Sequence, residues 1–137
     1  MIASIYLFLI KDDNILLLKR QNTGYEDGNY GLPAGHLDDN ESLTTGIIRE
    51  TKEEIGIVLT KQDIQIVQIM HRKEEDIRMD FFFYAKHWVG QPANTEPDKC
   101  SDLRFFPLNN LPENTIGYIK QAIENYQKNI FYTELGW

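Results

Sequence analysis

The chain has 137 residues, of which 42% are hydrophobic, so we expect one domain spanning residues 1–137 with a packed core. The net charge of −7 excludes a nucleic-acid groove as the expected function, because an acidic surface repels a polyanion. No apolar run nears the ~20 residues of a membrane span, no signal peptide is visible, and the single Cys100 allows no internal disulfide, so we expect a cytoplasmic protein with no membrane partner.

The first third of the chain predicts a β-hairpin followed by a loop. An apolar, β-branched run over 2–10 indicates a strand, a polar turn follows at 11–14, and 15–19 forms the returning strand. A loop rich in glycine and asparagine is expected over 21–31. One further short strand is expected within 30–33.

A change of period then indicates a helix. Packable side chains recur every four residues at Leu43, Ile47, Thr51 and Ile55. This spacing predicts a helix with one buried stripe. Asp38, Asp39 and Asn40 are candidate caps at its start, and Gly56 is its expected stop.

The second half predicts three more strands and a final helix. The strands are expected over 64–71, 79–88 and 103–108, with a charged turn at 72–76, a loop at 90–99, and a helix that begins at 112–115. The run over 79–88 is long and apolar, which favours a central strand. Hairpins mixed with packed helices predict an α/β (α+β mixed) sandwich with a mixed sheet, although the pattern fixes no strand order.

Three glutamates crowd one edge of the predicted helix. At ~100° per residue, Glu54 lies about 40° to one side of Glu50 and Glu53 about 60° to the other. Such crowding is unfavourable without a counter-charge, and Mg²⁺ prefers carboxylate oxygens as ligands. Arg49, four residues before Glu53, can hold one carboxylate in place. Taken alone, the three glutamates are also compatible with a solvated acidic face.

The wider context resembles a known family. Residues Gly35, Glu41, Arg49, Glu50, Glu53, Glu54 and Gly56 match the pattern G-x5-E-x7-R-E-U-x-E-E-x-G-U, in which U is apolar. This pattern identifies the chain as resembling the Nudix hydrolases, MutT-like enzymes that cut diphosphate linkages with water. Two departures are Thr51 at an apolar position and Ala34 where many relatives carry a second glycine.

The resemblance implies an α/β/α sandwich with a mixed sheet and a loop–helix–loop motif that binds Mg²⁺, for which Mn²⁺ can substitute. By match of position, Glu50 and Glu54 are the principal metal ligands, and Glu53 is a further ligand or a water activator. The Gly35 carbonyl is an additional ligand. Glu50, Glu53, Arg49 and Glu41 form the catalytic set, in which Arg49 orients the glutamates and Glu41 stabilises the loop and helix.

Three residues outside the helix are candidates for substrate binding: Arg20, His36 and Glu96. Arg20 follows Lys19 at the end of a strand and can contact phosphates, although a solvated strand end explains it equally well. His36 follows the motif glycine, and a structural hydrogen bond is its alternative role. Glu96 opens Glu-Pro-Asp-Lys, which resembles the Glu-Pro-Glu-Lys loop of a Nudix subgroup that hydrolyses nucleoside triphosphates.

The resemblance therefore favours hydrolysis of a nucleoside triphosphate, including oxidised or modified dNTPs, to a monophosphate and pyrophosphate. An alternative substrate is ADP-ribose or another nucleoside diphosphate derivative, since the motif contacts only the diphosphate. A nucleotide sensor without catalysis is a third reading, which the intact glutamates oppose. A calcium-binding module is a fourth, opposed by the lack of a D-x-D-x-D-G loop. A homodimer is plausible by resemblance to the subgroup.

Overall fold

A computed structural model describes all residues, 1–137. The strands are β1 (Ile2–Phe8), β2 (Ile10–Lys11), β3 (Asn14–Arg20), β4 (Tyr30–Gly31), β5 (Ala34–His36), β6 (Ile64–Lys73), β7 (Ile77–Ala85), β8 (Cys100–Pro107) and β9 (Tyr132–Leu135). The helices are α1 (Leu43–Ile55) and α2 (Gly117–Gln127), with a short 3-10 turn η1 (Lys61–Asp63). No helix is both long and apolar enough to cross a bilayer.

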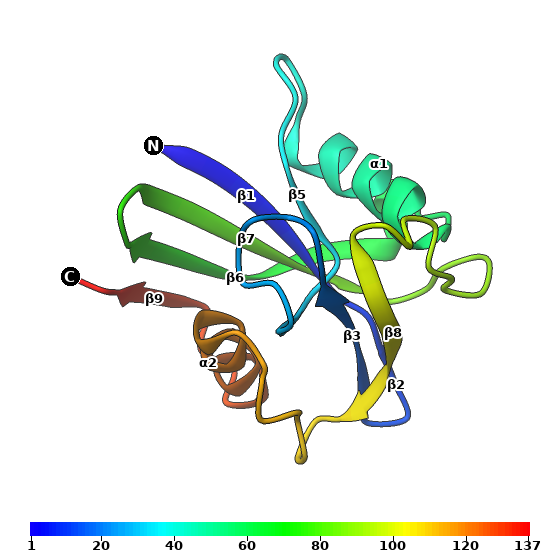
Figure 1. Cartoon of the computed structure of the whole chain (residues 1–137). Helices are drawn as coiled ribbons and strands as arrows, with labels where there is room; N and C mark the ends of the chain where they lie inside the picture. The colour runs from blue at the N-terminus through cyan, green and yellow to red at the C-terminus, as the bar shows by residue number, and fades with distance from the viewer.

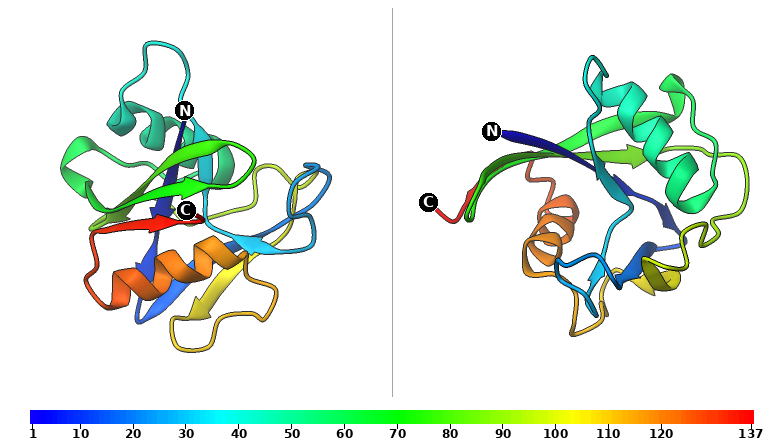
Figure 2. Two further views of the ribbon diagram at one scale, coloured as in Figure 1. Left: turned by 90° about the vertical axis from the view of Figure 1, so that its left-hand side faces the viewer. Right: turned by 45° about the horizontal axis from the view of Figure 1, so that its top comes forward.

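The strands form two sheets. The larger has the order β5-β1-β7-β6-β9, and it is mixed because the β1–β7 and β6–β9 pairs are parallel. The smaller has the order β2-β3-β4, with β8 also paired to β3. Helices α1 and α2 lie on opposite sides of the larger sheet (Figures 1 and 2). This confirms the expected mixed sheet between two helical layers, and it adds a second sheet that the sequence did not reveal.

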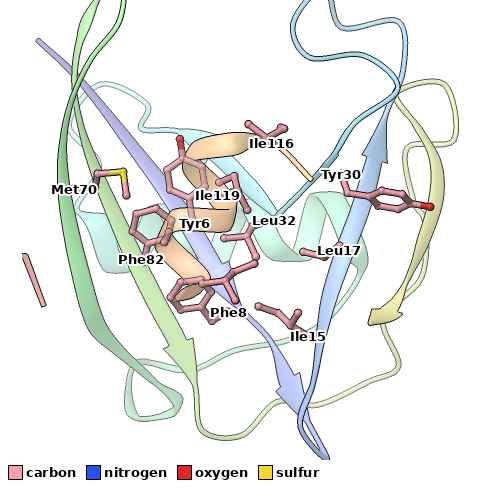
Figure 3. Close-up of a cluster of buried hydrophobic side chains, with 12 residues drawn as sticks. Tyr6, Phe8, Ile15, Leu17, Tyr30, Leu32, Met70, Phe82, Ile116 and Ile119 are labelled. Carbon is pink, nitrogen blue, oxygen red and sulfur yellow. The ribbon is translucent and has the colours of Figure 1, made fainter. Parts of the chain in front are cut away.

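Strand alternation along β1 divides the core into two halves. Ile5 faces α1 and packs in one buried cluster with Ile47. Tyr6 and Phe8 face the other way and share a second cluster with Ile119 of α2 (Figure 3). Because successive side chains of a strand point to opposite faces, β1 supplies side chains to both halves of the core.

The predicted hairpin is present but shorter than expected. The run over 2–10 breaks at Leu9, so β1 belongs to the larger sheet and β2 to the smaller one. The tight turn between β2 and β3 consists of Asp12 and Asp13, whose φ angles are 51° and 62°. Left-handed φ at both central positions is typical of the type I′ turns that match the twist of paired strands.

Of the predicted ends of α1, the C-terminal one is correct and the N-terminal one is not. Ser42 caps the helix, since its Oγ accepts a hydrogen bond from the Thr45 amide at 3.1 Å. The expectation for Asp38, Asp39 and Asn40 was wrong because the helix begins later, at Leu43. Gly56 ends the helix as expected, with a left-handed φ of 75°.

The predicted start of the charged turn, at residue 72, was wrong. Arg72 and Lys73 continue β6, and the Arg72 side chain is only 2% exposed because Asp80 of β7 pairs with it. The strand after the turn, β7, occupies the centre of the larger sheet as expected. Helix α2 begins at Gly117 and not at 112–115. Strands β5 and β9 were not predicted, because both are short and lack an apolar alternation.

Candidate active site

A cleft of about 690 Å³ brings together residues that are far apart in the sequence. Helix α1 contributes Glu50, Glu53 and Glu54, strand β5 contributes Gly35 and His36, β3 contributes Arg20, and the loop before β8 contributes Glu96. The two remaining candidates, Glu41 and Arg49, lie behind the glutamates and do not line the cleft. All nine candidate residues therefore lie in or directly behind one cleft.

Glu50 and Glu54 are the two desolvated carboxylates of the cleft. Burial raises the pKa of Glu54 to about 8, even though the Ala34 amide donates a hydrogen bond to its Oε1 at 3.2 Å. Burial also raises the pKa of Glu50, whose side chain is 18% exposed. The Glu50 carboxylate lies so close to Gly35 that a Cβ at position 35 would collide with it. Glycine at this position therefore makes room for the carboxylate.

Arg49 donates hydrogen bonds to three glutamates, Glu41, Glu50 and Glu53. Its Nε and Nη2 donate to the two oxygens of Glu41 at 2.7 and 2.8 Å, a bidentate pair. Its Nη1 donates to Glu50 at 2.9 Å and to Glu53 at 3.2 Å. The hydrogen bonds from Arg49, with a further one from the Asp38 amide, lower the pKa of Glu41 to about 2. Glu41 therefore stays ionised and fixes the guanidinium that holds Glu50.

The three glutamates of α1 are not equivalent. Glu53 is 59% exposed and pairs with Arg49 at 3.2 Å, whereas burial raises the pKa of both Glu50 and Glu54. No three acidic, histidine or cysteine side chains come together as a preformed metal cluster. The donors that are desolvated together are two carboxylates, beside the backbone of Gly35. Such an oxygen-only set fits a hard divalent cation, which prefers carboxylate and carbonyl oxygens as ligands.

The two departures from the family pattern are accommodated. Thr51 is fully buried on the apolar stripe, and its hydroxyl donates to the Ile47 carbonyl at 2.8 Å. Ala34 has no positive φ, so its Cβ causes no backbone strain. Its amide contributes a hydrogen bond to Glu54 instead.

The three substrate-binding candidates, Arg20, His36 and Glu96, line the same cleft as the glutamates. Arg20 lies against Tyr25, with its Nε donating to the Tyr25 carbonyl at 2.8 Å. The His36 ring nitrogen Nε2 is 3.3 Å from Nη1 of Arg78. The Glu96 backbone amide donates to Asn94 Oδ1 in the same loop at 3.1 Å. The Glu96 side chain is exposed and lines the cleft. All three side chains line the cleft.

Several cleft residues were not candidates from the sequence, among them Ser4, Tyr6, Arg72 and Tyr118. The first two lie in a run that predicts only a strand. A signal for Arg72 does exist, since Asp80 is an acid inside the apolar run over 79–88 and a buried acid needs a partner.

Comparison with known proteins adds an independent result. The family model of the NUDIX domain matches residues 2–126. An ADP-ribose pyrophosphatase of Methanocaldococcus jannaschii is 27% identical over 118 residues, which are 86% of this chain and 68% of that protein. An 8-oxo-dGTP diphosphatase of Buchnera aphidicola subsp. Schizaphis graminum is 26% identical over 130 residues, 90% of this chain and 92% of that one.

Solved structures agree on the fold. The crystal structure of a MutT NUDIX hydrolase from Burkholderia pseudomallei has a TM-score of 0.82 and 27% sequence identity, and the match covers 90% of this chain and 95% of that one. A MutT protein from Methanosarcina mazei Go1 has a TM-score of 0.79 at 23% identity, covering 93% of both chains. The two helical layers around a mixed sheet are therefore shared with these proteins.

Proposed function

The chain belongs to the Nudix family, and on this premise we propose that it is a magnesium-dependent pyrophosphohydrolase that converts a nucleoside triphosphate into the monophosphate and pyrophosphate. The observation that carries the proposal is the pair of desolvated carboxylates, Glu50 and Glu54, beside Gly35 in a cleft that can hold a nucleotide. Canonical or oxidised dNTPs are the substrates we favour, in line with the relatives named 8-oxo-dGTP diphosphatase.

Glu50, Glu54 and the Gly35 carbonyl would hold the cation, Mg²⁺ or Mn²⁺. When bound, the cation neutralises phosphate charge and makes a coordinated water more acidic. The raised pKa of Glu54 fits this role. Burial disfavours the ionised form of this carboxylate, and a bound cation would stabilise that form.

The protein side chains supply orientation and proton acceptance. Arg49, anchored by Glu41, fixes the positions of Glu50 and Glu53. Glu53 keeps an exposed carboxylate at the cleft, where it can accept a proton from the attacking water or complete the metal site. Arg20, which lines the cleft, would add positive charge for a phosphate chain.

A second substrate class rests on one observation, the similarity to the ADP-ribose pyrophosphatase of M. jannaschii. The same carboxylates would hold the cation for hydrolysis of ADP-ribose, because the diphosphate of ADP-ribose contains the same kind of P–O–P bond as a triphosphate.

A substrate panel tests the proposal. The purified protein would be assayed with Mg²⁺ on dGTP, 8-oxo-dGTP, dATP and ADP-ribose, with products identified by mass. We expect a triphosphate to have the highest kcat/KM and to yield the monophosphate and pyrophosphate. Glu50→Gln and Glu54→Gln should each lower turnover by about tenfold or more, since even residues that only orient metal ligands contribute ~10–100-fold. Higher kcat/KM for ADP-ribose than for every triphosphate would reverse the choice of substrate.

A further inference from the structure

The loop before β8 is bonded to the C-terminal end of α1, the helix that carries three glutamates of the cleft (Figure 1). The last carbonyls of an α-helix have no donor within the helix. At the end of α1, the Ile55 carbonyl accepts from the Ala93 amide at 2.9 Å, and the Glu54 carbonyl accepts from the Thr95 amide at 3.4 Å. The Glu53 carbonyl accepts from Thr95 Oγ1, across a separation of 42 residues in the sequence. This distant loop therefore caps the helix.

The same loop forms a tight turn around Glu96. Asn94 bridges the turn, since its Oδ1 accepts from the Glu96 amide at 3.1 Å and its Nδ2 donates to the Cys100 carbonyl at 2.7 Å. The Glu96 carbonyl accepts from the amides of Lys99 and Cys100 at 2.9 and 3.0 Å. The Glu96 backbone is thus fixed within the loop, so its place in the cleft depends on where the loop is anchored.

A second anchor joins the loop to the segment that follows β3. Gln21 Nε2 donates to the Pro97 carbonyl at 2.8 Å, and Asn22 Nδ2 donates to the Asp98 carbonyl at 3.0 Å. These bonds hold one side of the loop, whereas Thr95 holds the other side to α1. The loop is therefore fixed between two elements that both line the cleft.

The loop places a further carboxylate beside those of α1. Glu96 lines the same cleft as Glu50, Glu53 and Glu54. Burial raises the pKa of Glu54 to about 8, and the charges of Glu50 and Glu96 add to the rise. Burial also raises the pKa of Glu50, with contributions from the charges of Glu53 and Glu96. A nearby like charge disfavours ionisation, so these carboxylates form one electrostatic group that two separate segments carry.

We infer that Thr95 is a positioning residue for the cation site, because its hydroxyl fixes the loop of Glu96 against the helix that carries the other carboxylates. Thr95 does not line the cleft, so it touches neither the cation nor the substrate. Mg²⁺ demands near-ideal octahedral geometry, so small changes in the spacing of the carboxylates around it weaken its binding. Without the Thr95 hydroxyl, the loop keeps only backbone bonds to α1, and the longer of them measures 3.4 Å. The inference rests on the proposed function, because it takes the cation site as its premise.

Direct measurement of cation binding tests this role. Thr95→Val removes the hydroxyl but keeps the size of the side chain and both backbone bonds, and the position is exposed, so we expect the fold to be retained. Mn²⁺ binding to the nucleotide-free protein is measured from the EPR signal of free Mn²⁺. We expect Thr95→Val to raise the Mn²⁺ dissociation constant by about tenfold, the lower end of what residues that orient metal ligands contribute. Thr95→Ser retains the hydroxyl and should restore the wild-type value.

Steady-state kinetics separates positioning from substrate binding. At a fixed Mg²⁺ concentration, kcat of Thr95→Val should fall about tenfold, whereas KM for the triphosphate should stay near its wild-type value because Thr95 does not reach the nucleotide. Thr60→Val is the matched control, since the Thr60 hydroxyl donates to Asp63 at 2.9 Å at an exposed position outside the cleft. This control loses the same chemical group and should keep wild-type Mn²⁺ binding and kcat.

The outcomes distinguish this inference from the proposed function. Wild-type Mn²⁺ affinity in Thr95→Val would overturn the inference, and a lower melting temperature alone would show a merely structural role. Equally weak Mn²⁺ binding in Thr95→Ser and Thr95→Val would also overturn it, since the hydroxyl would then not be the group that acts. In both cases the wild type would still hydrolyse a triphosphate, so the proposed function would stand. If the wild type neither bound Mn²⁺ nor hydrolysed a triphosphate, the proposed function would fail and the inference with it.

Discussion

Replacing Glu54 with glutamine should stabilise the metal-free protein at high pH. The folded-state pKa of Glu54 is about 8 against an ordinary value of 4.5, because burial disfavours the charged form. Between these two values the folded state binds more protons than the unfolded state, so stability falls as pH rises from 4.5 to 8. At 1.36 kcal/mol per pH unit, this lowers the free energy of unfolding at pH 7 by on the order of 3 kcal/mol. We reduce this figure to about 1–3 kcal/mol because the Glu54 side chain keeps some exposure to solvent.

Glutamine has the same shape, carries no charge, and can still accept from the Ala34 amide. In EDTA at pH 8, we expect Glu54→Gln to melt roughly 5–10 °C above the wild type, and at pH 4.5 the difference should largely vanish. Differential scanning calorimetry across this pH range measures it. Glu53→Gln is the matched control, since that side chain is 59% exposed and should shift the melting temperature little. A pH-independent difference, or a lower melting temperature for Glu54→Gln at pH 8, would refute the reasoning.

Three further outcomes follow from the contacts of the site. Gly35→Ala should lower kcat by about tenfold or more, because the new Cβ displaces the Glu50 carboxylate; Gly117→Ala, whose Cβ meets nothing within 4 Å, should leave kcat unchanged. Glu41→Gln should lower kcat about tenfold in steady-state assays, since the arginine clamp loses its charged anchor, and an unchanged kcat would contradict that role. Asp80→Asn should lower the free energy of unfolding in urea by about 3–5 kcal/mol, because Arg72 keeps a buried charge; a loss under about 1 kcal/mol would contradict the pairing.

The parts of the fold that sequence predicted are those with a strong local pattern. The four-residue period of Leu43–Ile55 and the left-handed stop at Gly56 lie where expected because both depend on neighbouring residues only. The break at Leu9 could not be predicted, since an apolar run reads the same whether it stays in one sheet or crosses to another. Strand β9 pairs with β6 across about half the chain, a contact that no local pattern encodes.

The same division applies to the site. The glutamates, Arg49 and Gly35 were identified because they lie in one contiguous motif. Ser4 and Arg72 reach the cleft through strand pairing between distant segments, so their side-chain types alone did not mark them. Arg72 was misplaced in a turn because charge predicts exposure on average, and its buried partner lies on the next strand.

The central claim is that Glu50 and Glu54 hold a divalent cation beside the substrate diphosphate. A crystal of the protein soaked in Mn²⁺ with a non-hydrolysable triphosphate, measured at the manganese edge, locates the cation directly. The account predicts an anomalous peak within direct coordination distance of oxygens from both carboxylates and from the phosphate chain. A peak elsewhere, or none while both side chains point into solvent, would contradict it.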